Sequence, residues 1–227
     1  MKLYHLVLIL LLSACASPKP LTAEMKLGSL KAVNLEETIT RKDELMMTWS
    51  LTAFDSRNKL VGVASSAWGV ETIRKGAVLS FASQAPVQVM IPKGGKVVAS
   101  LVLIEVDDYT QAQQLIRRIR DINGWMQVPA GFFELGTELL TPLKYVTTAL
   151  TAAGLGVQVA DRLDKDDILG QSSVEIHDQA DSRKTKSPSV THVPARFTGR
   201  HLRDSFEYAV EYDIHLKRMK IKPASGR

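Results

Sequence analysis

The stretch SFEYAVEYDIHLK, residues 205–217, predicts the fold of this chain more clearly than any other part of it. Apolar or aromatic side chains occupy six successive even positions, which are Phe206, Tyr208, Val210, Tyr212, Ile214 and Leu216. Polar side chains occupy most of the odd positions, namely Glu207, Glu211, Asp213, His215 and Lys217. Because successive side chains of a strand point to opposite faces, this pattern predicts a long strand with one buried face.

Several earlier segments also have the composition of strands. MTWSLTAFDS, residues 47–56, alternates apolar and hydroxyl side chains and predicts a half-buried strand. LVGVASSAW, AVLSFASQ and PVQVMIP follow it with Gly, Pro or polar breaks between them. VVASLVLIEV, residues 97–106, is an almost continuous apolar run, which favours a central strand that is covered on both faces.

Two helical segments lie between the early strands and the last one. In residues 107–124 the apolar side chains recur at helical spacing, at Ala112, Leu115, Ile116, Ile119 and Ile122. Residues 132–154 are also helical in pattern, and Pro142 marks either a break or the first turn of a new helix. Long strands first and last, with helices between them, predict a mainly β fold: an antiparallel β-sandwich with a helical insertion at about 109–155.

The chain begins with the pattern of a secretory signal. Lys2 precedes an apolar run from Leu6 to Leu12, which is shorter than the roughly 20 residues of a membrane-spanning helix but suits a signal core. The run ends in Leu12-Ser13-Ala14-Cys15, which resembles the lipobox of bacterial lipoproteins. The resemblance implies removal of the signal peptide 1–14 and a covalent lipid on Cys15. The alternative is an ordinary secretory signal in which the cysteine occurs by chance.

The lipobox resemblance implies a location and a domain plan. The acyl chains would anchor the protein in a membrane, and Ala16 after the cysteine directs such lipoproteins to the outer membrane, here with the domain on the periplasmic side. Residues 15–42 have no sustained period and predict a tether. Residues 43–222 then form the β-sandwich domain, and 223–227 form a tail. Cys15 is the only cysteine, so an intramolecular disulfide is excluded.

Charge argues against nucleic acid as a partner. Without residues 1–14 the chain has 213 residues, with 28 Lys and Arg against 24 Asp and Glu. The two basic clusters, at 116–122 and 215–227, lie far apart in the sequence and lack interleaved aromatic residues. A nucleic-acid-binding surface would concentrate its positive charge. We therefore expect the membrane and other envelope proteins as partners, and no nucleic acid.

Four carboxylates gather in DRLDKDDILG, residues 161–170, at Asp161, Asp164, Asp166 and Asp167. Calcium takes about six to eight oxygen ligands, and such loops supply them. Residues 157–176 resemble the third calcium loop of C2 domains, at Asp161, Asp166, Asp167, Leu169, Gly170, Val174 and Ile176. The resemblance implies a C2-like sandwich and a calcium site, to which Asp107 and Asp108 could contribute.

The alternative for this segment is a solvated turn without a metal ion. The family's Asp-x-Asp start is absent here, because three positions separate Asp161 from Asp164, and its Ser-Asp-Pro-Tyr loop has no counterpart. In a turn the carboxylates would cap backbone amides, Lys165 would offset charge, and Gly170 would take a φ that only glycine tolerates. We favour the turn and expect no cofactor, with calcium as the possible exception.

The chain lacks the common catalytic signatures. It has no Gly-x-Ser-x-Gly, His-Glu-x-x-His or P-loop motif, and one cysteine cannot form a thiolate zinc site. Trp68 and Trp125 lie beside glycines and either line a ligand groove or belong to the core. The polar residues 178–200 predict a long exposed loop.

These patterns favour an interaction protein over an enzyme. We expect a lipid-anchored accessory subunit of an envelope assembly. A calcium-dependent module that binds lipid or glycan is the first alternative, and an envelope hydrolase is the second.

Overall fold

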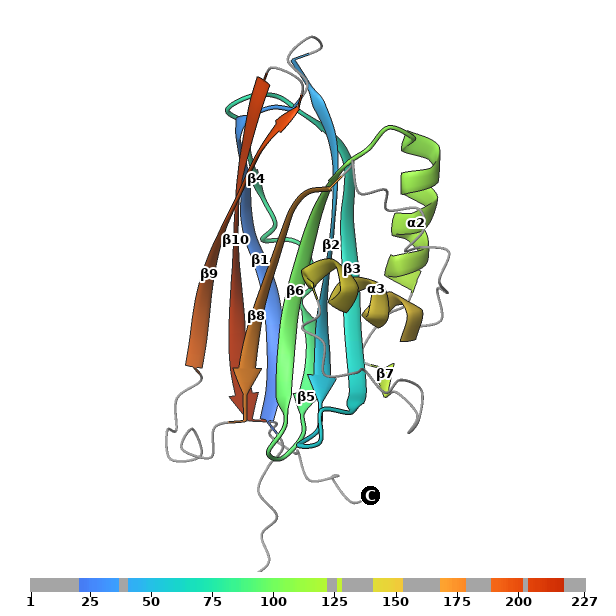
Figure 1. The fold of residues 1–227 in the computed structure, drawn as a ribbon, viewed down its shortest axis with the longest axis vertical. Helices are drawn as coiled ribbons and strands as arrows, with labels where there is room; N and C mark the ends of the chain where they lie inside the picture. The colour runs from blue at the N-terminus through green and yellow to red at the C-terminus, as the bar shows by residue number, and fades with distance from the viewer. Residues whose placement is uncertain are drawn as a thin grey trace, which may run out of the picture.

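Two antiparallel sheets pack face to face, and helices cover the outer face of one of them (Figure 1). The structure is a computed structural model that describes residues 21–36, 41–121, 126–127, 141–152, 168–178, 189–201 and 204–218. The mainly β, antiparallel sandwich with a helical insertion is therefore confirmed. The acidic residues that suggested a C2-like domain, 161–167, lie outside the described residues.

The first sheet, sheet A, has the strand order β4-β1-β10-β9, and β5 also pairs with β1. Its strands are β1 (Leu21–Asn34), β4 (Val78–Ser80), β5 (Val87–Ile91), β9 (Ser189–His201) and β10 (Asp204–Arg218). The second sheet, sheet B, has the order β7-β3-β2-β6-β8. Its strands are β2 (Asp43–Phe54), β3 (Leu60–Ile73), β6 (Lys96–Glu105), β7 (Met126–Gln127) and β8 (Ile168–His177).

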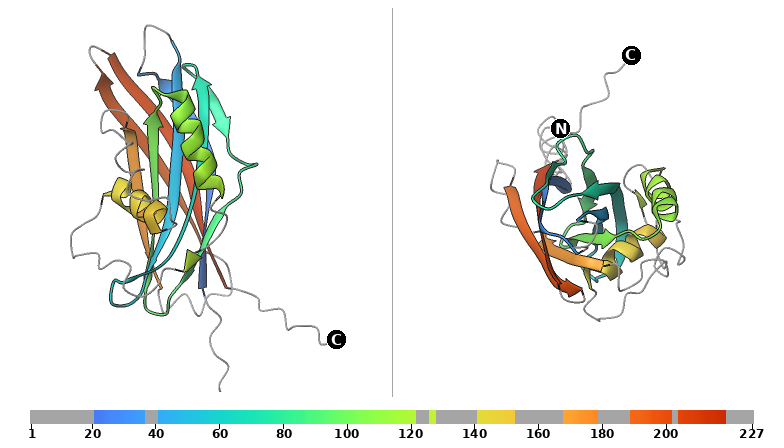
Figure 2. Two further views of the ribbon diagram at one scale, coloured as in Figure 1. Left: turned by 90° about the vertical axis from the view of Figure 1, so that its right-hand side faces the viewer. Right: turned by 90° about the horizontal axis from the view of Figure 1, so that it is seen from above.

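Two helices lie over the outer face of sheet B, as the left view of Figure 2 shows. They are α2 (Tyr109–Asp121) and α3 (Pro142–Ala152). α2 buries the apolar side chains whose spacing predicted it, from Ala112 to Ile119. α3 begins at Pro142, so this proline occupies the first turn, where its missing N–H and fixed φ are tolerated.

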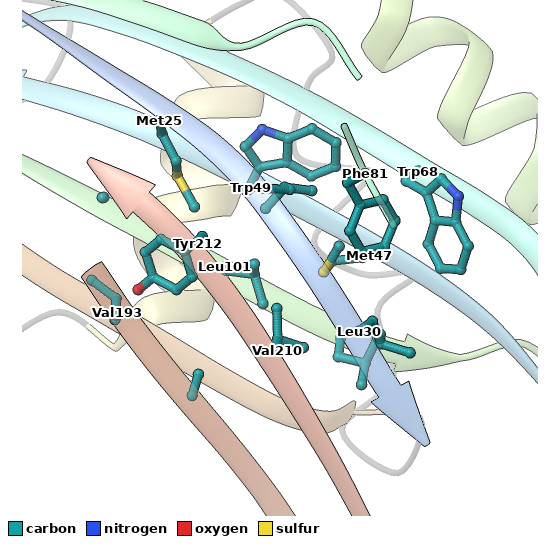
Figure 3. Packing of buried hydrophobic residues seen from close by; sticks show 14 of the residues in the cluster. Met25, Leu30, Met47, Trp49, Trp68, Phe81, Leu101, Val193, Val210 and Tyr212 are labelled. Carbon is teal, nitrogen blue, oxygen red and sulfur yellow. The ribbon is translucent and has the colours of Figure 1, made fainter. Parts of the chain in front are cut away.

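The main core lies between the sheets and contains the apolar face of β10 (Figure 3). The alternation that predicted this strand is confirmed. Phe206, Tyr208, Val210, Tyr212 and Ile214 are all buried, and Leu216 packs against them at the strand end. Each large side chain that leaves water contributes roughly 1.5–3 kcal/mol to folding. This face of β10 is therefore a large share of what holds the two sheets together.

β2 is not half-buried, contrary to the prediction from its alternation. Its hydroxyl side chains Thr48, Ser50 and Thr52 are at most 1% exposed. They point away from the main core, toward the side of sheet B that the two helices cover. β6 was predicted to be covered on both faces, and its buried run from Val97 to Ile104 confirms this.

Residues 21–34 are not a tether, which corrects the predicted 15–42 boundary. They form β1, which pairs with β10 on one edge and with β4 and β5 on the other. Met25 and Leu30 are completely buried. The strand period was hidden because register shifts interrupt β1 between Leu27 and Ser29 and again before Asn34.

The predicted loop 178–200 is also partly wrong. Residues from Ser189 onward form β9, an edge strand that pairs with β10 along its whole length. Its inner face carries Val193, Ala195 and Phe197, all buried. Pro194 lies between them, and an edge strand tolerates it because no neighbour requires its N–H.

Gly170 has a different role from the predicted turn. It lies inside β8, and its φ is not in the left-handed region. A Cβ atom at this position would lie 2.0 Å from Cγ of Phe197 on β9. Glycine is therefore required because β8 of sheet B and β9 of sheet A approach closely at this corner of the sandwich.

Candidate functional site

The chain enters the sandwich at its lower end in Figure 1, where β1 begins. Leu21 pairs with Ile91 at the end of β5 and with Arg218 at the end of β10. Cys15 lies outside the described residues, and only residues 16–20 separate it from Leu21. Six residue steps span at most about 20 Å when fully extended. A group attached to Cys15 would therefore stay close to this end of the molecule.

Two turns lie beside this entry point, one within sheet B and one that connects sheet A to sheet B. The first joins β2 to β3, and the Asp55 carboxylate accepts the N–H groups of Arg57 at 2.8 Å and Lys59 at 2.9 Å. These hydrogen bonds, with the Lys59 bond first, hold the pKa of Asp55 below its ordinary value. The Asp55 carboxylate is thus occupied by backbone N–H groups of its own turn.

The second turn joins β5 to β6 and lies against the first. A Cβ atom on Gly94 would lie 3.8 Å from Cβ of Ser56. The Gly94 N–H donates to Oδ2 of Asp178 at 2.9 Å, and the Asp178 N–H donates to the Gly95 carbonyl at 2.9 Å. These contacts therefore hold the ends of β2, β5 and β8 next to one another, and together they form one surface.

Some cations of this surface are exposed to solvent, and one is paired. Arg57, Lys59 and Lys93 are exposed, and we name these three residues the basic end. Lys96, beside them, is engaged, because it pairs with Glu175 at 3.0 Å and lies over the Phe54 ring. The lower end of the sandwich therefore presents cations to solvent.

The acidic residues Asp161, Asp164, Asp166 and Asp167 lie outside the described residues. The strand that follows them in the sequence, β8, is described. β8 begins at Ile168, which is paired with Ile104 near the end of β6. Asp107 and Asp108 follow the end of β6 after one intervening residue, so they and the beginning of β8 lie at the same end of sheet B, the upper end in Figure 1.

Asp108 has a structural role as the residue that precedes α2. Its Oδ1 accepts the Gln111 N–H at 3.0 Å, and its Oδ2 accepts the Gln111 side-chain amide at 2.7 Å. These two bonds hold the pKa of Asp108 below its ordinary value. Within the described ranges, no three His, Cys, Asp or Glu side chains are grouped so that they could hold a metal ion.

The outer face of sheet A carries a buried carboxylate, Glu24 of β1. It accepts hydrogen bonds from Lys217 at 2.5 Å and Gln88 at 2.6 Å, and Lys26 lies 3.3 Å away. Burial by itself would raise the pKa of Glu24, but the hydrogen bonds and charges of Lys217 and Lys26 outweigh it and lower the pKa. This cluster joins β1, β5 and β10 at the lower end of sheet A.

Further charged pairs cover the same face of sheet A. His192 lies 2.8 Å from Asp213, and Arg196 lies 2.8 Å from Glu207. Both pairs link β9 to β10. The face is thus highly polar, with its charges largely compensated within it, and no described helix lies over it (Figure 2).

Sequence reasoning missed a row of serines across sheet B. Pairing places Ser65 of β3, Ser50 of β2, Ser100 of β6 and Ser173 of β8 side by side. The hydroxyls of Ser50, Ser65 and Ser100 are buried and have no hydrogen-bond partner among the described residues. Single serines in separate segments give no signal for this row, because only the register aligns them.

The described tryptophan of the predicted groove belongs to the core. Trp68 is 5% exposed, and its ring meets Phe81 edge-on at 5.1 Å between centroids (Figure 3). Its indole N–H donates to Glu71 at 3.1 Å. Of the two alternatives for Trp68, the structure supports core packing. Trp125 lies outside the described residues.

Among the described helices, none is long and apolar enough to cross a membrane. No protein-family model matches the chain, and no curated protein matches it.

Proposed function

We propose that this protein is a lipid-anchored envelope lipoprotein. Its sandwich faces the periplasm from the outer membrane and acts as an accessory interaction subunit that holds a partner near the membrane. The carrying observation is the short distance along the chain between the lipobox cysteine, Cys15, and the first strand of the sandwich. A folded domain that begins six residues after an acylated cysteine is held directly at the bilayer surface.

The anchor is tested by the variant Cys15→Ser. Expressed in a bacterium that processes lipoproteins, the wild type should incorporate a palmitate analogue and sediment with membranes. The variant should not be labelled and should be soluble or unprocessed. Met25→Ala with Cys15 intact is a control for reduced stability, because it weakens the core and leaves the lipobox unchanged. Equal labelling of wild type and Cys15→Ser would contradict the proposal.

The outer face of sheet A is the surface that we assign to the partner. The two helices cover sheet B, whereas no described helix lies over the polar face of β9 and β10. Reversal of one charge, Arg196→Glu, should remove the partner that co-purifies with the detergent-solubilised wild type. The double variant Arg196→Glu/Glu207→Arg restores the internal ion pair, so recovery of the partner there would mean that the pair acts only within the fold. An unchanged set of co-purified proteins in both variants would contradict the assignment.

Calcium-dependent binding is the second candidate, and one observation favours it. Asp107 and the beginning of β8, which follows the acidic loop, lie at the same end of sheet B. An ion that binds only the folded state would stabilise it by about 2.7 kcal/mol at a hundredfold excess over Kd. Each kcal/mol raises Tm by roughly 2–4 °C in a domain of this size.

We expect no calcium-specific change in Tm for the mature chain, since we favour the turn. Asp164→Asn/Asp166→Asn should then behave like the wild type in calcium, magnesium or chelator. Differential scanning fluorimetry measures this directly. A rise in Tm that calcium alone produces, and that the double variant abolishes, would establish the calcium site instead.

A further inference from the structure

We propose that the basic end, formed by Arg57, Lys59 and Lys93, binds the headgroups of anionic phospholipids. The sandwich then stands on the membrane with its lower end down. This inference rests on the proposed lipid anchor at Cys15, and it adds an orientation and a lipid class to it.

The length of the chain before β1 is the first argument. Residues 16–20 can extend only to about 20 Å between Cys15 and Leu21. Leu21 pairs with Ile91, which lies two residues before Lys93. The anchor therefore keeps the lower end of the sandwich, which carries the basic end, within about 20 Å of the acylated cysteine.

The direction of the charges is the second argument. Arg57, Lys59 and Lys93 are exposed. Three described carboxylates beside these cations are directed to other groups: Asp55 and Asp178 accept backbone N–H groups, and Glu175 pairs with Lys96. An anionic surface that approaches this end therefore encounters these three exposed cations before the engaged carboxylates. Attraction between such cations and anionic lipid falls off within a Debye length, about 10 Å at 0.1 M salt, so close attachment is required for it to act.

The opposite end of the sandwich provides the contrast. The turn after β3 also has two exposed cations, Arg74 and Lys75. The same end carries Asp107, which is exposed, and Asp108, which is exposed but accepts two hydrogen bonds from Gln111, so its charge is mixed. β2 connects the two ends, and its twelve residues span roughly 36 Å at about 3.3 Å per residue. The two ends are therefore far enough apart for a short-range probe to distinguish them.

The experiment uses the purified, lipidated full mature chain in vesicles. Cys15 is the only cysteine and its thiol is acylated, so one added cysteine gives a unique labelling site. A fluorophore is placed on Ser56→Cys at the lower end or on Thr72→Cys at the upper end, both exposed positions. Vesicles contain either phosphatidylcholine alone or phosphatidylcholine with a quarter of phosphatidylglycerol, and a short-range quencher is attached to a fraction of the headgroups.

In anionic vesicles the label at position 56 should be quenched strongly and the label at 72 weakly. The difference should shrink in neutral vesicles and in high salt. Lys59→Glu/Lys93→Glu should abolish it, whereas the matched reversal Arg74→Glu/Lys75→Glu should leave it unchanged. Circular dichroism and Tm confirm that each variant is folded, and both reversals alter exposed turns.

Four results would overturn the inference, and they are distinguishable. If the wild type floats with vesicles of both compositions but its two labels are quenched equally, the anchor stands and the orientation is wrong. Equal loss of the difference in both charge reversals, or a difference unchanged by phosphatidylglycerol, also excludes recognition by the basic end. If the mature chain floats with neither vesicle, the lipid anchor itself is wrong and the orientation proposal is wrong with it.

Discussion

Tyr208 and Tyr212 differ from the other core residues of β10, because each brings a hydroxyl into the space between the sheets. The Tyr208 hydroxyl donates to Asp43 at the beginning of β2, and Asp43 also accepts the Glu36 N–H at 2.8 Å. The Tyr212 hydroxyl lies 2.9 Å from the Ser172 hydroxyl on β8. Burial, and then the Asp43 carboxylate, raise the pKa of Tyr208, so it remains a protonated donor. Both tyrosines therefore join sheet A to sheet B by polar contacts as well as by packing.

Tyr208→Phe should destabilise the fold by about 1–3 kcal/mol, because it removes a donor from a buried carboxylate. Tyr212→Phe should cost less, roughly 0.5–1.5 kcal/mol, since Ser172 is only partly buried and can bind water. Urea unfolding of the two variants beside the wild type measures both values. The opposite order would show that the Asp43 contact is not the stronger of the two.

Glu24 predicts a dependence of stability on pH. Its folded pKa is lowered, so its contribution is present above its unfolded pKa and is lost as pH falls through the folded pKa, below about 4.5. Lys217→Met removes one donor and should reduce the free energy of unfolding at pH 7 by on the order of 1–2 kcal/mol. Near pH 3 the wild type and the variant should become more alike. A loss of the same size at both pH values would mean that Lys217 acts through packing and not through the Glu24 charge.

At the scale of elements, the outer face of sheet B is divided by its serine row. One apolar cluster lies between sheet B and the two helices and includes Val102 of β6 and Ile116 of α2. A second one includes Phe54 and Val63. α3 contributes Val146 to the first cluster and Ala149 to the second, so it crosses the hydroxyl-bearing strip between them. A buried hydroxyl without a partner costs about 1–3 kcal/mol. The helical layer is therefore held by its apolar contacts and weakened along this row.

Ser100→Ala should leave stability unchanged or raise it by up to about 1 kcal/mol, because it removes a buried hydroxyl that has no partner among the described residues. Thr48→Val is the matched control on the same face. The Thr48 hydroxyl donates to the Ser66 carbonyl at 3.3 Å, so its removal should cost about 0.5–1.5 kcal/mol. Thermal unfolding of both variants tests the contrast. If Ser100→Ala costs as much as Thr48→Val, the serine hydroxyl has a bound water.

At the scale of the whole molecule, the sandwich depends on a strand from each end of the chain. β1 lies between β10 and the pair β4 and β5, and it supplies buried side chains such as Met25 and Leu30 to the main core. Pairing of β1 with β10 joins residues almost two hundred positions apart. The domain boundary therefore lies before Leu21 and not at residue 43.

A fragment of residues 43–227 should fail to fold cooperatively, because it lacks β1 and exposes one edge of β10. A fragment of residues 19–227 keeps every described strand and should unfold in a single transition. Circular dichroism with urea unfolding compares the two. A cooperative transition of similar midpoint in the shorter fragment would show that β1 is dispensable for the core.

Local sequence patterns were sufficient to predict the elements that have a regular period. Alternation predicted β10, an almost continuous apolar run predicted β6, and helical spacing predicted α2. It also placed Pro142 near a helix boundary, and α3 begins there. These predictions succeed because period and turn chemistry are properties of neighbouring residues. The resemblance to a lipobox at Cys15 and the cluster of carboxylates from Asp161 are also local patterns, and the lipid anchor and calcium site that they imply remain predictions.

Contacts between distant parts of the chain determine which faces are covered and which segments pair. β1 was missed because its register shifts break the period, and β9 because polar residues and Pro194 are tolerated at an edge. The sequence predicted that Ser50 faces solvent, but the helical layer buries it. It predicted a turn at Gly170, but this glycine is needed because Phe197 packs against it. In each case the deciding contact comes from a residue far away in the sequence, and no local pattern records such a contact.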